Sequence, residues 1–144
     1  MELLNVSEYE TAAAQRLEPG AHGYYAGGAN DERTLRDNVE AYGRWQLRPR
    51  VLVDVAEPST STTVLGREIA LPLLIAPMAY QRAGHPDGEV AMARAAAAAG
   101  TIMCLSTLAT ATLDEIAATD VPRWFQFYVP RDTGVAAEIG RAHV

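Results

Sequence analysis

Short apolar runs alternate with helical segments in the second half of the chain, and this alternation constrains the fold more than any other feature. Each run is apolar along its whole length, as in strands that are covered on both faces. We therefore expect strand, helix, strand, helix, strand, helix, which makes an α/β protein with a parallel sheet, either doubly wound or a (β/α) barrel. The expected strands are residues 71–79, 101–107 and 123–129, and the expected helices are residues 87–100, 112–119 and 132–144.

Local signals delimit these helices. Asp87 stands where an N-cap is expected, and Gly100 follows the alanine-rich run as a stop. Thr112 and Glu115 have the spacing of a capping box. Nothing of this kind closes the last helix, which we expect to run to the final residue. A (β/α)8 barrel takes ~250 residues and eight repeats, so three repeats predict part of a longer protein.

The preceding residues, 1–70, read as a preamble to the three βα units of residues 71–144. Ser7 and Glu10 suggest a capping box for a first helix, which the sequence "EPG" would end. The segment "DERTLRDNVEAYGRW" predicts an amphipathic helix with its apolar residues at helical spacing. After it, "LRPRVLVDV" and "TSTTVLGREIALP" predict short strands around a turn.

Composition excludes several classes of function. A chain with 49% hydrophobic and 21% charged residues is typical of a soluble globular protein. The net charge of −6, with twelve dispersed basic residues, argues against a nucleic-acid partner. No apolar run approaches the ~18 residues of a membrane span, so we expect no membrane partner. The single cysteine, Cys104, predicts a cytoplasmic protein without an internal disulfide.

Common catalytic signatures are absent from the sequence. There is no GxGxxG loop, no P-loop and no GxSxG elbow. His22, His85 and His143 are too scattered for metal-ligand spacing, so no metal site is predicted.

Polar or specialised residues instead follow each predicted strand. In parallel α/β folds the functional residues gather at the carboxyl ends of the strands. The glutamine in the otherwise apolar sequence "WFQFYVP" is one of these residues, and a wet face of an edge strand is the alternative explanation for it. The residues at the three strand ends are Pro77, Met78 and Ala79, then Ser106 and Thr107, then Gln126 and Tyr128.

Five ordered motifs resemble one known family. They are "YYAGGANDERTLRDN", "RPRVLVDV", "PLLIAPMA", "HPDGEVAMARAAAAAGTIMCLST" and "FQFYV". Together they resemble the N-terminal part of the FMN-dependent α-hydroxy acid oxidases and dehydrogenases, which act on glycolate, lactate or mandelate. The resemblance implies a (β/α)8 TIM barrel with FMN at the carboxyl ends of its strands.

The resemblance also implies roles for single residues. The backbone of Pro77, Met78 and Ala79 would lie along the flavin ring, and Ser106 and Gln126 would hydrogen-bond the polar edge of the ring. Tyr128 would act as a catalytic and substrate-binding residue, and Tyr24 would bind the substrate carboxylate. Leu108 stands where plant glycolate oxidases have a bulky tryptophan, which hints at a larger substrate such as mandelate or 4-hydroxymandelate.

The implied reaction is the oxidation of an (S)-2-hydroxy acid to a 2-oxo acid, with O2 reduced to hydrogen peroxide. The histidine base, arginine and lysine of the family have no match in these residues, so we expect no turnover by this chain alone. The resemblance implies a homo-oligomer, often a tetramer. Two alternatives stay open: a dehydrogenase linked to a quinone or cytochrome, and a non-catalytic half-barrel.

Overall fold

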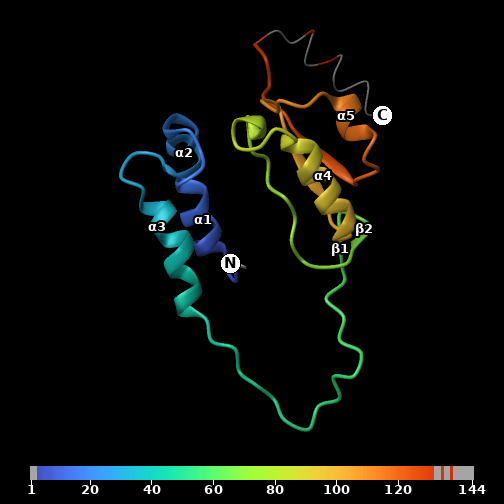
Figure 1. Cartoon of the computed structure of the whole chain (residues 1–144). Coiled ribbons are helices and arrows are strands. Elements are labelled where there is room, and N and C mark those ends of the chain that lie inside the picture. The colour runs from blue at the N-terminus through green and yellow to red at the C-terminus, as the bar shows by residue number, and fades with distance from the viewer. Residues whose placement is uncertain (1–2, 132–133, 135–136, 138–144) are drawn as a thin grey trace. The chain divides into compact units, whose positions relative to one another are not determined.

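The computed structural model describes residues 3–131 together with residues 134 and 137. The chain divides into two compact units, Met1–Pro58 and Ser59–Val144. Figure 1 shows the helices of the first unit in blue to cyan and the mixed helices and strands of the second in green to red. Each unit is described by itself below.

The first unit begins with helix α1, Val6–Ala14, and its N-cap is Asn5 rather than the expected Ser7. The Asn5 side chain accepts a hydrogen bond from the Glu8 N–H at 3.1 Å. The Glu8 carboxylate in turn accepts from the Leu4 N–H at 2.8 Å and from Asn5 Nδ2 at 3.0 Å. The reciprocal pair therefore lies two residues earlier than the predicted Ser7 and Glu10, because Asn caps as well as Ser does.

A second helix, α2 (Pro19–Ala26), was not anticipated from the sequence. Pro19 and Gly20 belong to its first turn instead of ending the preceding helix. Proline suits a first helical position because its missing N–H would have no helical partner there.

The predicted amphipathic helix of the first unit is confirmed as α3, Arg33–Glu40, and continues as the 3-10 helix η1, Ala41–Arg44. Its apolar residues Val39 and Tyr42 are exposed. The segment 47–55 forms no strand, so that prediction was wrong. Pro49 has no N–H to donate, and within the described part of the chain no second strand pairs with this segment.

The second unit opens with a hairpin of β1 (Thr62–Val64) and β2 (Arg67–Ile69), as the sequence predicts. Leu65 and Gly66 join the two strands with φ values of 48° and 78°. Two positive φ values give the turn the twist that a tight hairpin needs. The hairpin belongs to the second unit, whereas the division into residues 1–70 and 71–144 stays a prediction.

Three parallel segments form the sheet that carries the predicted site. Strand β3 (Met103–Ser106) pairs in parallel with β4 (Arg123–Gln126). On the other side of β3, the first apolar run contributes a parallel bridge between Ile75 and Met103. Its hydrogen bonds run from the Ile75 N–H to the Ile102 carbonyl at 3.0 Å and from the Cys104 N–H to the Ile75 carbonyl at 2.8 Å. Strand β3 is therefore central.

Helices follow the parallel segments in the predicted order. The short 3-10 helix η2 (Gln81–Ala83) and helix α4 (Gly88–Ala98) follow the first segment, and α5 (Leu113–Ala117) follows β3. The buried core includes Ala93, Ala96, Met103, Leu105 and Ile116. Apolar side chains from α4, α5 and β3 therefore make one core, which confirms the α/β alternation in this unit.

The helix boundaries follow the sequence signals in part. Gly100 has a φ of 66°, and a Cβ there would lie 2.9 Å from that of Ala70, so only glycine fits. The capping box of Thr112 and Glu115 is present, with both reciprocal hydrogen bonds formed. Asp87 occupies the N-cap position of α4, but its side chain caps nothing. Its backbone is already in the helical region, where the side chain does not reach the first turn.

The expectation that every apolar run is buried on both faces was wrong. Strand β3 is buried, whereas Trp124 and Phe125 of β4 are 37% and 39% exposed. In the described residues β4 has a strand neighbour on one side only, so the sheet is open and no barrel closes. The expected last helix, 132–144, lies mostly outside the described residues.

Candidate functional site

The carboxyl ends of the three parallel segments lie at one edge of the sheet, as predicted. Ser106 and Gln126 are register partners at the ends of β3 and β4. On the other flank, the Tyr80 N–H donates to the Leu108 carbonyl at 3.1 Å. The loops after the first segment and after β3 are thus joined, which brings the Pro77 to Ala79 backbone to the edge that carries Ser106.

Thr107 extends the pairing of β3 with β4 beyond the last ladder position. Its hydroxyl donates to the Gln126 carbonyl and accepts from the Tyr128 N–H at 3.2 Å. Its own N–H donates to Gln126 Oε1 at 3.4 Å. Thr107 therefore orients both the amide side chain of Gln126 and the backbone of Tyr128, whose side chain is exposed.

The donors at this edge suit the polar edge of a flavin, which presents carbonyl oxygens and a ring N–H. Ser106 is nearly buried, and its Oγ accepts from the Leu108 N–H at 3.1 Å, which leaves the hydroxyl proton to donate. Among the described residues no protein atom accepts from Gln126 Nε2. Two donors therefore stand side by side, and the methyl side chain of Ala79 allows a planar ring to approach the backbone. The residues present fit FMN.

Sequence reasoning missed the most buried polar group near this edge. Glu89, on the first turn of α4, has no exposed surface. Its Oε1 accepts from the Thr110 N–H at 2.8 Å and the Gln81 N–H at 3.2 Å. Its Oε2 accepts from the Thr110 hydroxyl at 2.6 Å and the Ala111 N–H at 3.2 Å. One carboxylate thus binds the loop after the first segment and the loop after β3.

A signal for Glu89 exists in the sequence. Positions 89, 93 and 96 share one helix face, and Ala93 and Ala96 are core residues. A glutamate in line with two core alanines indicates a buried carboxylate. Burial acts to raise the pKa of Glu89, but hydrogen bonds from Thr110 and Gln81 outweigh it and lower the pKa below its usual range. The group is therefore ionised at neutral pH.

Arg82 joins the same two loops at the surface. Its Nη2 lies 2.6 Å from Glu115 Oε1, and its Nη1 donates to the Thr110 carbonyl at 3.0 Å. A backbone hydrogen bond from Thr112 and the bond from Arg82 lower the pKa of Glu115. Because both side chains are over a third exposed, the ion pair itself adds little stability.

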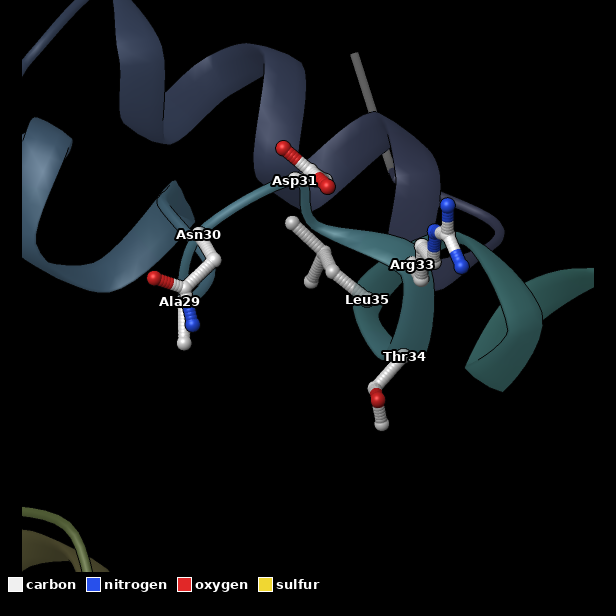
Figure 2. Close-up of a pocket in the computed structure, with 6 residues that line it drawn as sticks. All are labelled: Ala29, Asn30, Asp31, Arg33, Thr34 and Leu35. Carbon is white, nitrogen blue, oxygen red and sulfur yellow. The ribbon is translucent and has the colours of Figure 1, made fainter.

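Tyr24 lies in the first unit, on α2. Its side chain is exposed, and its ring meets that of Tyr25 edge-on, with centroids 5.5 Å apart. Figure 2 shows the residues that line a pocket in the same unit; they belong to the loop before α3 and to its first turn, and Tyr24 is not among them. The lining residues are Ala29, Asn30, Asp31, Arg33, Thr34 and Leu35. The predicted carboxylate-binding role of Tyr24 stays a prediction.

No helix in the part of the chain that the structure describes has the length and apolarity to cross a membrane.

Comparison with known proteins places the chain in one family. The sequence profile of the FMN-dependent dehydrogenases matches residues 13–143. Glycolate oxidase 1 of Zea mays is 50% identical over 141 residues, which are 97% of this chain and 38% of that protein. Glycolate oxidase of Spinacia oleracea is 49% identical over 142 residues, 98% of this chain and 38% of that protein.

Solved structures agree with the sequence comparison. A crystal structure of mandelate oxidase matches with a TM-score of 0.90 and 38% identity, over 98% of this chain and 41% of that one. A lactate oxidase of Pediococcus acidilactici matches with a TM-score of 0.87 and 33% identity, over 100% of this chain and 42% of that one. These matches define the class of the fold, which is that of the FMN-dependent dehydrogenases and oxidases. The chain belongs to the FMN-dependent α-hydroxy acid oxidase family, and it spans about two-fifths of the length of these relatives.

Proposed function

We propose that this chain supplies the flavin-binding edge and part of the substrate pocket of an (S)-2-hydroxy acid oxidase built on a complete (β/α)8 barrel. The observation that carries the proposal is the pairing of Ser106 with Gln126, which sets two hydrogen-bond donors at the carboxyl edge of the parallel sheet. FMN, when bound, accepts the two electrons and the α-hydrogen of the acid and passes the electrons on.

The residues of this chain hold and orient the flavin ring and the substrate. The backbone of Met78 and Ala79 supports the ring plane, while Ser106 and Gln126 donate to its polar edge. Thr107 holds the Gln126 carbonyl and the Tyr128 N–H, so the backbone of Tyr128 is fixed at the same edge. The Tyr128 phenol is assigned to hydrogen-bond the substrate hydroxyl as a catalytic residue.

Two residues are assigned to the substrate. The Tyr24 phenol donates a hydrogen bond to the substrate carboxylate, a role that suits a side chain with a polar tip and an apolar body. Leu108 is 39% exposed in the loop after β3 and lines the pocket for the substrate side chain. Leucine leaves more room in this pocket than tryptophan does. The larger pocket favours mandelate or 4-hydroxymandelate over glycolate as the substrate, and lactate also fits it.

Oxygen is the proposed electron acceptor, so the second product is hydrogen peroxide. The solved mandelate and lactate relatives are named oxidases, which supports this choice over a quinone- or cytochrome-linked dehydrogenase. The protein is proposed to work in the cytoplasm as a homo-oligomer, a tetramer by family resemblance.

The experiment is a substrate and acceptor panel on the full-length protein loaded with FMN. Glycolate, (S)-lactate, (S)-mandelate and (S)-4-hydroxymandelate are each supplied with O2, or without O2 and with a redox dye. Peroxide formation that is fastest with an aromatic acid is the expected result. Reduction of the dye in the assay without O2, combined with no peroxide in the assay with O2, would favour the dehydrogenase. A protein that binds no FMN would refute the proposal.

A further inference from the structure

Glu89 forms the most connected buried polar cluster in the described residues, and nothing in the proposed chemistry uses it. Its side chain is fully buried and accepts four hydrogen bonds, two at each carboxylate oxygen. The donors come from Gln81, Thr110 and Ala111, which are 8, 21 and 22 residues away in sequence. The carboxylate therefore joins segments that local structure alone does not bring together.

The donors lie directly beside the residues assigned to the flavin and the substrate. Gln81 follows Ala79 by two positions, and its Nε2 donates to the Met78 carbonyl at 3.5 Å. Thr110 follows Leu108 by two positions, and the Leu108 carbonyl accepts from Tyr80. A shift of the Glu89 carboxylate would therefore move the flavin-supporting backbone and the pocket loop together.

The first turn of α4 is built for this close approach. Gly88 has a φ of 44°, and a Cβ there would lie 2.7 Å from Arg82 Cγ and 3.1 Å from the Arg82 backbone nitrogen. Arg82 in turn donates its N–H to the Thr110 hydroxyl at 3.2 Å. Thr110 thus accepts from the first loop and donates to Glu89, which makes its hydroxyl the shared atom of the cluster.

Stability alone gives little reason for a carboxylate here. Burying a charge has a large desolvation cost, and apolar replacements of buried ionic groups are often neutral or stabilising. A carboxylate instead fixes geometry, because its two oxygens accept hydrogen bonds from donors on two loops and thereby hold the loops at a defined spacing.

We propose that Glu89 is a positioning residue of the flavin site, which acts through Thr110 and Gln81 to set the spacing between the Met78–Ala79 backbone and the Leu108 loop. This inference rests on the proposed function, since it assumes that FMN binds at this edge.

The test compares Thr110→Val, which removes the shared hydroxyl at nearly constant shape, with Thr110→Ser, which keeps the hydroxyl. Glu89→Gln is the second variant, and Glu68→Gln, on an exposed strand position, is the matched control. FMN affinity is measured by quenching of flavin fluorescence, the visible circular dichroism reports the surroundings of the bound ring, and thermal unfolding is recorded without FMN.

The expected result is about tenfold weaker FMN binding and an altered dichroism spectrum in Thr110→Val and Glu89→Gln, as for a lost hydrogen bond to a charged group. Thr110→Ser and Glu68→Gln retain the affinity and spectrum of the wild type. Should Thr110→Val fail to fold, Glu89→Gln carries the test.

Two results would overturn the inference in distinguishable ways. Variants that unfold at lower temperature but bind FMN with unchanged affinity and spectrum would make Glu89 a purely structural residue and leave the proposed function standing. A wild-type protein that does not bind FMN would refute the proposed function, and this inference with it.

Discussion

Ser106 and Gln126 are directly opposite each other in the parallel pairing of β3 with β4. They end two strands whose sequence separation is twenty residues, and the intervening α5 and its loops return the chain to the same edge. Side chains that are distant in sequence thereby form one group of donors, and this arrangement is the physical basis of the predictions below.

Gln126→Leu removes the amide donor at nearly constant volume. We expect about tenfold weaker FMN binding, because one hydrogen bond to the ring is lost and a polar group of the cofactor is left unpaired. Fluorescence titration of the apoprotein with FMN measures the affinity. Gln15→Leu is the control, because it makes the same change at an exposed position. Equal affinity for FMN in Gln126→Leu and the wild type would place the amide outside the flavin site.

Tyr24→Phe removes a phenol donor from the substrate carboxylate. We expect KM for the hydroxy acid to rise by about tenfold with a smaller change in kcat, since a hydrogen bond to a charged group is lost. Steady-state kinetics checks this. The neighbouring Tyr25→Phe is the matched control, because Tyr25 shares the ring contact with Tyr24 but has no assigned role. A KM that rises equally in both variants would contradict the assignment.

Tyr128→Phe deletes the phenol at the strand edge and leaves the backbone bond to Thr107 intact. Bound FMN should be retained, while reduction of the flavin by substrate slows by roughly 10- to 100-fold, the range of one positioned polar group. Stopped-flow absorbance measures the rate. Loss of flavin from this variant would show instead that Tyr128 is structural.

Leu108→Trp fills the proposed side-chain pocket. For mandelate, kcat/KM should fall about tenfold or more, while the small acid glycolate is affected less, because a hydrophobic pocket discriminates mainly by size. The ratio of the two kcat/KM values is the measurement. A ratio that does not change would remove Leu108 from the pocket.

Acid stability should depend on Glu89. Its pKa is lowered in the folded protein, so its stabilising effect is fully present above the ordinary pKa of an unfolded glutamate and is lost as the pH falls through the lower pKa of the folded state. Glu115, paired with Arg82, shifts in the same direction. Urea unfolding from about pH 6 to about pH 3 should therefore show a steeper loss of stability in the wild type than in Glu89→Gln. Parallel curves would contradict the ionised, hydrogen-bonded carboxylate.

Local patterns were enough to predict much of the second unit. The alternation of apolar runs with capped helices anticipated β3, β4, α4 and α5, since the capping box at Thr112 depends on nearby residues only and a positive φ after a helix favours glycine, as at Gly100. The same reasoning failed for residues 47–55, because a strand needs a partner and propensity alone does not supply one. It also failed for α2, because Pro19 begins this helix, whereas the sequence suggested only that it would end the preceding one.

The location of the site at the carboxyl edge of the sheet could be predicted from the sequence, but the hydrogen-bonded cluster that supports this edge could not. Strand ends follow from topology, so Ser106 and Gln126 could be placed at one edge from the sequence. The cluster around Glu89 could not, because its hydrogen bonds span 8 to 22 residues and connect two loops of irregular backbone. Tyr24 belongs to the other unit, and its role rests on family resemblance.

The most direct test of the central claim is to mix the FMN-loaded full-length protein with (S)-2-hydroxy acids in the absence of oxygen and record the visible absorbance of the flavin. We predict that the (S)-acids bleach the flavin, that the (R)-acids do not, and that admitting O2 restores the colour and yields peroxide. A flavin that stays oxidised with every 2-hydroxy acid would contradict the assignment of this strand edge to 2-hydroxy acid oxidation.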